Sequence, residues 1–434
     1  MTGLLPWAAV TIFVVAYILI ATERIHRVAA ALGGAGVMLA LGITDAETAF
    51  FSTEAGVDWN VVFLLLGMMI IVGVLSQTGL FEFLAIWAAK RARGQPFRVM
   101  VLLVLITAVG SALLDNVTTV LLIAPVTILV CERLGAPVVP FLIAEALASN
   151  IGGTATLVGD PPNIIIASRA GLSFNDFLLV LAPLVVILLV VFIGLCRVLF
   201  RRSFAYNAER AKAVMELSER EAISDRRLLV KSLVVLGAVM VAFVLHTALH
   251  LEPAVVALLG AGVLVTVARL PVSVALSEVE WPTLAFFMGL FVMVGGLIHT
   301  GVIESLSRAA ANATEDRLLL TTMVLLWASA ILSAIVDNIP YVATVSPIVA
   351  DLVSAAEGGT TDPNVLWWSL ALGADLGGNA TAIGASANVV ILGIAERNRH
   401  RISFWEFTKY GLVVAVITVA LSVPYLYLRF FAFG

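Results

Sequence analysis

The feature that most constrains this chain is an acidic motif that occurs twice inside apolar sequence. The pairs Asp115-Asn116 and Asp337-Asn338 stand at equivalent positions of the two halves, and a proline follows each pair at the same distance. A carboxylate in hydrocarbon surroundings is costly, so an ionisable residue there marks a functional site. The duplication predicts one site to which two repeats contribute, an arrangement common in secondary transporters.

Apolar composition places the chain in a membrane. Of its 434 residues, 61% are hydrophobic and 12% are charged, against a typical charged share of about 25%. The predicted fold is an all-α polytopic membrane protein of the plasma (inner) membrane. Ten apolar stretches are long enough to cross a hydrocarbon core of about 30 Å, and they lie near residues 4–22, 28–44, 59–76, 137–167, 177–199, 229–247, 253–269, 281–298, 365–394 and 406–430.

Two further apolar stretches, 98–131 and 317–353, carry the Asp-Asn motif near their middle. Each could form two full spans or one re-entrant hairpin that returns to its starting side. Length favours the hairpin. The segments from Arg98 to Leu113 and from Val120 to Cys131 are both shorter than the stretch of about 20 residues that a crossing helix needs.

The basic residues predict the orientation of the chain. With the N-terminus outside, all of the 25 Lys and Arg residues except Arg169, Arg308, Arg317 and Arg429 fall in cytoplasmic loops, in agreement with the positive-inside rule. Both termini are then outside the cell. Counting each interrupted stretch as two spans gives the same orientation, so charge does not decide between hairpins and spans.

The two halves of the chain align as an internal repeat. Trp59 and Trp281, for example, show the same separation along the chain as the two acidic motifs. With hairpins, each half has five full spans, and this odd number makes the second half enter the membrane from the opposite side. We therefore predict two inverted repeats, 1–200 and 229–434, each with five spans plus one re-entrant hairpin. The charged segment 201–228 is the predicted cytoplasmic connector.

Glycine and proline residues predict a broken helix in each half. A Gly-Gly pair, a further glycine and a Pro-Pro pair interrupt a regular helix. Residues 137–167 are therefore expected to form two half-helices joined by an unwound stretch from Gly152 to Asn163, and residues 365–394 are the counterpart. At membrane depth, such backbone is tolerated only where it is buried in protein or lines a cavity. Its carbonyls and the half-helix N-termini can bind ions.

Two structural alternatives stay open. The Gly-Gly pairs could allow close packing of helices, and the motif aspartates could be inter-helix hydrogen-bonding groups with no ligand. We favour binding, because the glycines recur beside polar residues and because Asn or Ser would make a cheaper hydrogen bond. The repeat has also lost symmetry at one position, where Asp160 is matched by Ala385.

The motifs resemble those of the ion transporter superfamily. Within it, they are most similar to the group of arsenical pumps, sodium/proton antiporters and P proteins. The resemblance rests on Asp115 through Thr119, on Asn150 through Asn163 and on Gly377 through Asn388, and it covers essentially the whole chain. It implies the two hairpins, an elevator-like transport domain and a homodimer.

The motifs and the resemblance together define a set of candidate residues. Hard oxygen ligands of this kind suit Na⁺ or protons better than a soft metal. The predicted Na⁺ ligands are Asp115, Asn116, Asp337 and Asn338, and no other cofactor is predicted. The predicted substrate- and ion-binding residues are Asp115, Asn116, Thr118, Thr119, Asn150, Gly152, Gly153, Thr154, Thr156, Gly159, Asp160, Pro161, Asn163, Asp337, Asn338, Asp375, Gly377, Gly378, Asn379, Thr381, Gly384, Ser386 and Asn388.

The acidic residues also bear on the cargo. The related divalent-anion/sodium symporters have serine where this chain has Asp115 and Asp337. Two acidic tips, with Asp160 and Asp375, would repel a dianion, since one like charge about 4 Å away costs roughly 4 kcal/mol at an effective dielectric of about 20. We expect no Lys or Arg in the core to offset these charges. A citrate-like cargo is then disfavoured unless bound cations neutralise the site.

The main functional hypothesis is a proton-linked antiporter that exports arsenite, antimonite or Na⁺ by an elevator-like mechanism. The alternative is a sodium-coupled symporter of carboxylates or another oxyanion, and a third class is a channel or a non-transporting scaffold. No nucleotide-binding loop or zinc spacing occurs in the sequence, which disfavours an enzyme. The expected partners are the lipid bilayer, a small inorganic ion and a second copy of the chain, with no nucleic acid. Association with a separate ATPase subunit stays open.

Overall fold

The computed structural model describes residues 4–22, 24–216, 218–314, 317–359 and 361–432, and all regular secondary structure in these ranges is helical. Nine of the described helices can cross a membrane by length and composition. The predicted all-α polytopic fold is thus confirmed. The long helices outside the two interrupted stretches and the two breaks are α1 (Leu5–Ala21), α2 (Arg27–Ala40), α4 (Trp59–Ser76), α11 (Ala182–Leu199), α13 (Arg226–Leu249), α14 (Pro253–Ala268), α16 (Trp281–His299) and α22 (Phe404–Leu426). The last of them, α22, continues into the π-helical turn η4 (Tyr427–Ala432).

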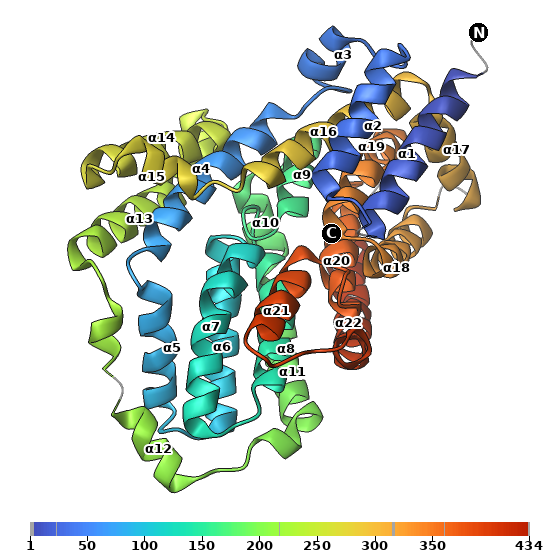
Figure 1. Ribbon diagram of the computed structural model, residues 1–434. Helices are drawn as coiled ribbons and strands as arrows, with labels where there is room; N and C mark the ends of the chain where they lie inside the picture. The colour runs from blue at the N-terminus through green and yellow to red at the C-terminus, as the bar shows by residue number, and fades with distance from the viewer. Residues whose placement is uncertain (1–3, 23, 217, 315–316, 360, 433–434) are drawn as a thin grey trace.

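Short helices occupy the loops between the long ones. They are α3 (Ala46–Phe51), α5 (Leu80–Arg91), α10 (Phe174–Val180), α12 (Ala208–Met215), α15 (Val272–Ser277) and α17 (Val302–Ala313). In the predicted connector, α12 lies between two 3-10 turns, η1 (Arg201–Ser203) and η2 (Glu219–Ala222), and packs under α5 (Figure 1). Lys90 on α5 pairs with Glu219 in η2 at 2.5 Å. The connector ends before residue 228, because α13 already starts at Arg226.

Helices from the two halves pack against each other in a reciprocal way. The α4 helix of the first half packs on α14 of the second, and α16 of the second half packs on α2 of the first. In both contacts a glycine, which has no side chain, lets the two helix backbones approach each other closely. A Cβ atom on Gly67 would meet the Ala257 backbone at 2.6 Å, and one on Gly289 would meet the Ala31 backbone at 2.8 Å. Two related repeats that each pack one helix against the other repeat would produce this pair of equivalent contacts.

The two interrupted stretches each form a pair of helices that meet at the Asp-Asn motif. The first pair is α6 (Pro96–Leu113) and α7 (Asn116–Leu134), and the second is α18 (Leu318–Ile335) and α19 (Asn338–Ala356). These helices are longer than the segments used to argue for hairpins, and each could cross a membrane by length alone. The length argument was therefore wrong, because α6 also includes Pro96 and Phe97 and α7 also includes residues 116–119 and 132–134.

A different observation supports re-entrant hairpins. The α6 helix packs along α8 (Val138–Gly153), and α18 packs along α20 (Val365–Gly377). Both α8 and α20 stop at the predicted breaks. The motif between α6 and α7 therefore lies beside the break, where Thr156 donates to the Ala112 carbonyl and Asn116 donates to Asp160. We retain the two re-entrant hairpins as a prediction.

Both predicted breaks occur, but they are shorter than expected. The first unwound stretch runs only from residue 154 to 160, and α9 (Pro161–Ala170) follows it. The second break consists of a 3-10 turn, η3 (Gly378–Ala380), and the turn before α21 (Ser386–Arg397). The expectation that unwinding begins at Gly152 and ends at Asn163 was wrong. The glycine pair can complete the last turn of α8, and proline suits the first turn of a helix.

The first glycine of each pair allows a close helix contact. A Cβ atom on Gly152 would meet the Ala108 carbonyl oxygen of α6 at 2.3 Å, and one on Gly377 would meet the Ala330 Cα of α18 at 2.4 Å. Residues 108 and 330 are themselves repeat-related. The alternative of close packing thus accounts for Gly152 and Gly377.

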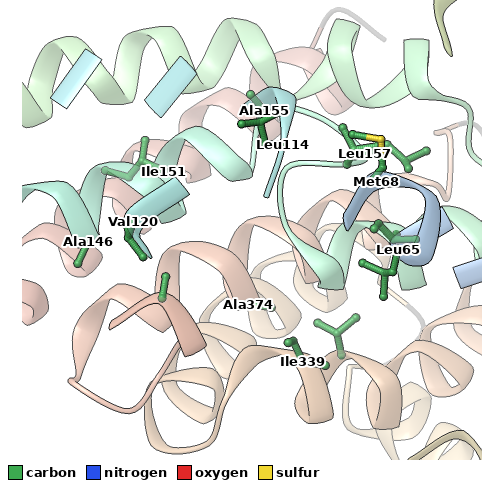
Figure 2. Packing of buried hydrophobic residues seen from close by; sticks show 14 of the residues in the cluster. Leu65, Met68, Leu114, Val120, Ala146, Ile151, Ala155, Leu157, Ile339 and Ala374 are labelled. Carbon is green, nitrogen blue, oxygen red and sulfur yellow. The ribbon is translucent and has the colours of Figure 1, made fainter. Parts of the chain in front are cut away.

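The core lies around the two breaks. Figure 2 shows the buried apolar side chains there, which come from α4, α8, both motif regions and the first unwound stretch. Leu65 and Met68 of α4 face Leu157 of the unwound stretch, and Ile339 of the second motif lies nearby. The polar residues at the breaks are therefore enclosed by an apolar shell.

Candidate functional site

Asp160 binds side chains from both halves of the molecule. It is buried at the end of the first unwound stretch. Asn116, from the first motif, donates its side-chain Nδ2 to Asp160 Oδ2 at 2.7 Å. Asn338, from the second motif, donates to both Asp160 oxygens at 3.3 and 3.4 Å. One carboxylate therefore binds repeat-related amides from both motifs.

The amide network continues beyond Asp160. Asn150 accepts a hydrogen bond from Asn116 at 3.2 Å, and it donates to Asn379 and Asn388 at 2.9 and 3.1 Å. All of these side chains are buried. The network thus joins α7 and α8 of the first half to η3 and α21 of the second half.

A second buried acid lies beside this network. Asp375, on α20, is fully buried, and Thr154 and Asn163 are its neighbours. Among the described residues, neither of its carboxylate oxygens has a hydrogen-bond partner, and the same holds for Oδ1 of Asn116. Asp375 acts electrostatically on Asp160. Buried polar atoms are normally satisfied, so these oxygens are suited to receive a proton or a small hard cation.

The unwound stretches are held by equivalent hydrogen bonds in both repeats. Thr156 donates to the Ala112 carbonyl and Thr381 to the Ala334 carbonyl, both at 2.5 Å. Asn163 and Asn388 each donate to two carbonyls of their own break. The internal repeat is therefore present in the hydrogen-bonding pattern as well as in the sequence.

The motif aspartates cap helices. Asp115 accepts a hydrogen bond from the Thr118 backbone N–H at 2.8 Å and caps α7. Asp337 accepts from the Ile339 N–H at 3.1 Å and caps α19, and its other oxygen accepts from Ser386 Oγ at 2.6 Å. Each aspartate has a structural role in addition to any role in binding.

We expect Asp115→Ala to lower the free energy of unfolding by about 1 kcal/mol, the usual cost of losing an N-cap. Asp115→Asn keeps an acceptor oxygen and should unfold at the wild-type temperature, while losing coupled transport because the charge is gone. Thermal unfolding in detergent and uptake into proteoliposomes separate the two effects. Equal destabilisation by both substitutions would contradict the capping role.

The four predicted Na⁺ ligands fall into two pairs. Asn116 and Asn338 donate to Asp160, whereas Asp115 and Asp337 line two neighbouring cavities that share Arg27 and Ser386. Within the described part of the chain, no group of three His, Cys, Asp or Glu side chains is placed to hold a metal ion. The oxygen-rich region is instead centred on Asp160.

The cavity lined by Asp337 also contains a basic residue that the sequence analysis missed. Arg27, at the start of α2, lines a cavity of about 400 Å³ together with Asp337, Ser386 and Glu280. It also lines the small cavity of about 40 Å³ that contains Asp115. The expectation that no Lys or Arg offsets the acidic core was therefore wrong. Arg27 is in a predicted cytoplasmic loop, and only the packing of α2 against α16 brings it here.

The contacts sort the candidate residues into three sets. Residues that hold the breaks in shape are Gly152, Gly153, Thr156, Gly159, Asn163, Gly377, Gly378, Thr381, Gly384 and Asn388. Residues in or beside the amide–acid network are Asn116, Asn150, Thr154, Asp160, Asn338, Asp375 and Asn379, together with Asn388, which also holds its break. Residues that line the two cavities are Asp115, Thr118, Pro161, Asp337 and Ser386. Thr119 packs against Gly110 of α6.

Comparison with known proteins agrees with this architecture. A family model described as citrate transporter matches residues 17–373. The chain belongs to the citrate transporter family. Membership of the ion transporter superfamily is thus confirmed. The chain is a multi-pass membrane transporter and not an enzyme.

Relatives cover nearly the whole chain. An uncharacterised transporter of Mycobacterium tuberculosis is 58% identical over 98% of this chain and 99% of its own length. The human P protein is 34% identical over 94% of this chain and 58% of its own length. The crystal structure of the Alcanivorax borkumensis YdaH transporter has the same fold, with a TM-score of 0.64 and 14% identity over 98% of this chain and 97% of that one.

Proposed function

We propose that this chain is a cation-coupled secondary transporter that carries a small carboxylate across the plasma membrane by alternating access. The observation that carries the proposal is the binding of Asp160 by Asn116 and Asn338, one from each motif. A proton or Na⁺ taken up beside Asp160 and Asp375 would change the charge at the point where the halves meet. Such a change is what couples ion binding to a conformational change.

The acidic surroundings set the order of binding. Two more carboxylates, Asp115 and Asp337, line the cavities next to Asp160, and like charges repel strongly in surroundings of low dielectric constant. An anionic cargo would therefore bind well only after cations have neutralised part of the site. This requirement is sufficient to couple the binding of the cargo to the binding of the ion.

The family description favours a carboxylate over the inorganic cargo that the sequence analysis preferred. The cavity beside Arg27 supports the same choice, because a guanidinium binds a carboxylate through two parallel hydrogen bonds. We further propose that the two repeats are inverted, that the termini lie outside and that the protein moves as an elevator within a homodimer.

The test is uptake of labelled citrate and succinate into proteoliposomes that contain the purified protein. An imposed Na⁺ or proton gradient should drive accumulation above the external concentration, and collapsing the gradient with an ionophore should abolish it. Equilibration without accumulation would identify a channel. Absence of any carboxylate movement under all gradients would reject the carboxylate cargo.

Proton-linked export of an inorganic species is the second candidate. It is favoured by the excess of acids at the site, since Asp115 and Asp337 line the cavities that contain Arg27, and Asp160 and Asp375 lie buried in the adjoining network. Everted vesicles would show proton flux on addition of arsenite or Na⁺ if this candidate is correct, and on addition of citrate if the first is.

A further inference from the structure

We propose that Arg27 is the residue that binds the cargo, by taking one of its carboxylate groups in the larger Arg27-lined cavity, between α2, α16 and α21. The inference rests on the proposed function, because it assigns the anion-binding part of the same transport site. It adds a residue that lies outside both repeated motifs.

The hydrogen bonds of Arg27 are of a kind that a ligand can replace. Its Nη1 donates to Ser386 Oγ at 3.1 Å, and its Nη2 donates to Thr283 Oγ1 at 3.4 Å. Both partners are neutral hydroxyls, and the bond to Thr283 is long. A carboxylate offers the guanidinium an opposite charge and two parallel N–H···O bonds, neither of which a hydroxyl supplies. A cargo carboxylate would therefore displace the two hydroxyls.

Each of these hydroxyls donates its own hydrogen bond to a carboxylate. Ser386 donates to Asp337 at 2.6 Å, and Thr283 donates to Glu280 at 3.0 Å. Arg27 is thus separated from both carboxylates by one hydroxyl. The arrangement keeps the guanidinium in place without pairing it directly, and its positive charge stays available to an anion.

The position of the guanidinium is fixed from the other side by an aromatic ring. The Arg27 Cζ lies 5.4 Å from the centroid of Phe286 on α16, within the range of a cation–π contact. The Arg27 side chain is half-buried. A guanidinium held in this way loses little rotamer freedom when a ligand binds.

The rest of the cavity is lined by apolar and charged side chains. Its apolar walls include Ile20, Val117, Leu121, Ile335 and Val389. Among the described residues His26 is its other basic group and Asp337 and Glu280 are its acids, so a compact organic anion would bind there together with cations that offset the two acids. One guanidinium can pair with one carboxylate. Binding of the carboxylate would also affect the ion site. Ser386 would lose its hydrogen bond from Arg27 and keep only the one that it donates to Asp337, and Asp337 caps α19 next to Asn338. The cargo is therefore sensed at the motif that binds Asp160.

The test measures binding separately from transport. Purified protein in detergent is titrated with sodium propionate, succinate or citrate at constant Na⁺, and affinity is measured by calorimetry and by the shift in thermal unfolding. We compare wild type with Arg27→Gln and Arg27→Lys, and use Arg24→Gln as the matched control because Arg24 is an exposed basic residue of the same loop.

We expect Arg27→Gln to weaken carboxylate binding by about 10- to 100-fold, the loss of one charge-assisted pair. Arg27→Lys should bind with intermediate affinity, and Arg24→Gln should match wild type. In the absence of carboxylate, the Na⁺ concentration that gives half-maximal stabilisation should not change in any variant. If Arg27→Gln unfolds, Arg27→Lys still decides, because it keeps the charge and loses the planar fork.

The possible results separate the two proposals. Unchanged carboxylate affinity in both Arg27 variants would overturn the role of Arg27 and leave the carboxylate transporter intact. Binding that depends on Arg27, with no gradient-driven uptake of the same anion, would support the binding site and reject the transport function. Stabilisation by phosphatidylglycerol that is lost in Arg27→Gln, with no effect of any carboxylate, would identify a lipid headgroup and overturn the proposal.

Discussion

Replacing Asp160 with asparagine is expected to abolish gradient-driven transport while leaving the fold intact. Asp160 accepts hydrogen bonds from Asn116 and Asn338. An asparagine has one acceptor oxygen for these two donors, and its own NH₂ group would face one of them. It also carries no charge with which to bind a cation. Hydrogen bonds to charged groups contribute about 1.5–3 kcal/mol each, so we expect uptake to fall on the order of 100-fold.

The measurement is initial uptake into proteoliposomes, with thermal unfolding as the check on folding. Asp351→Asn is the matched control. Asp351 lies on α19 and accepts a hydrogen bond from Ser307 at 2.7 Å, but its side chain is exposed. The control should transport at the wild-type rate. Wild-type coupling in Asp160→Asn would show that the central carboxylate is a structural acceptor only.

A large effect on stability is expected at Gly152, the glycine where the first break meets α6. A methyl group on Gly152 would lie 2.3 Å from the Ala108 carbonyl oxygen. Because this neighbour is backbone, the helices must separate, and overpacking of this kind costs typically about 1–3 kcal/mol. Gly152→Ala should therefore lower the unfolding temperature and reduce transport by displacing the nearby Asn150. Gly377→Ala should do the same in the second half.

Gly194→Ala is the control for these substitutions. Gly194 also lies inside a long apolar helix, α11, and a Cβ atom there would meet no described atom within 4 Å. The control should be neutral or slightly stabilising, because alanine is the better helix former by about 1 kcal/mol. Similar losses in Gly152→Ala and Gly194→Ala would mean that the close contact with α6 does not limit stability.

The spans could be predicted from sequence because they depend on local composition. The α4 helix coincides with the predicted stretch 59–76, since its apolar run is bounded by Asp58 and Gln77. The positions of the breaks were predicted correctly, but the predicted unwound stretch was too long. A glycine pair can end a helix or stay within its last turn, and the neighbouring α6 backbone decides which.

The prediction also failed where function depends on contacts between distant segments. Arg27 contributed only to the orientation argument, because its sequence neighbours are those of an ordinary membrane-edge arginine. Its partner Ser386 lies near the opposite end of the chain. A basic residue directly at the start of an apolar helix was the one local signal, and that signal does not distinguish an anchor from a binding residue.

The sequence by itself determined that the chain is a polytopic membrane transporter with a duplicated acidic motif, because hydropathy and repeat spacing are properties of the chain alone. The tertiary structure decided what the motif does. Its two asparagines meet at Asp160, an acid with no partner in the other repeat, and its two aspartates cap helices and face cavities. These roles follow from how two halves pack against each other, and that packing is not encoded in any single segment.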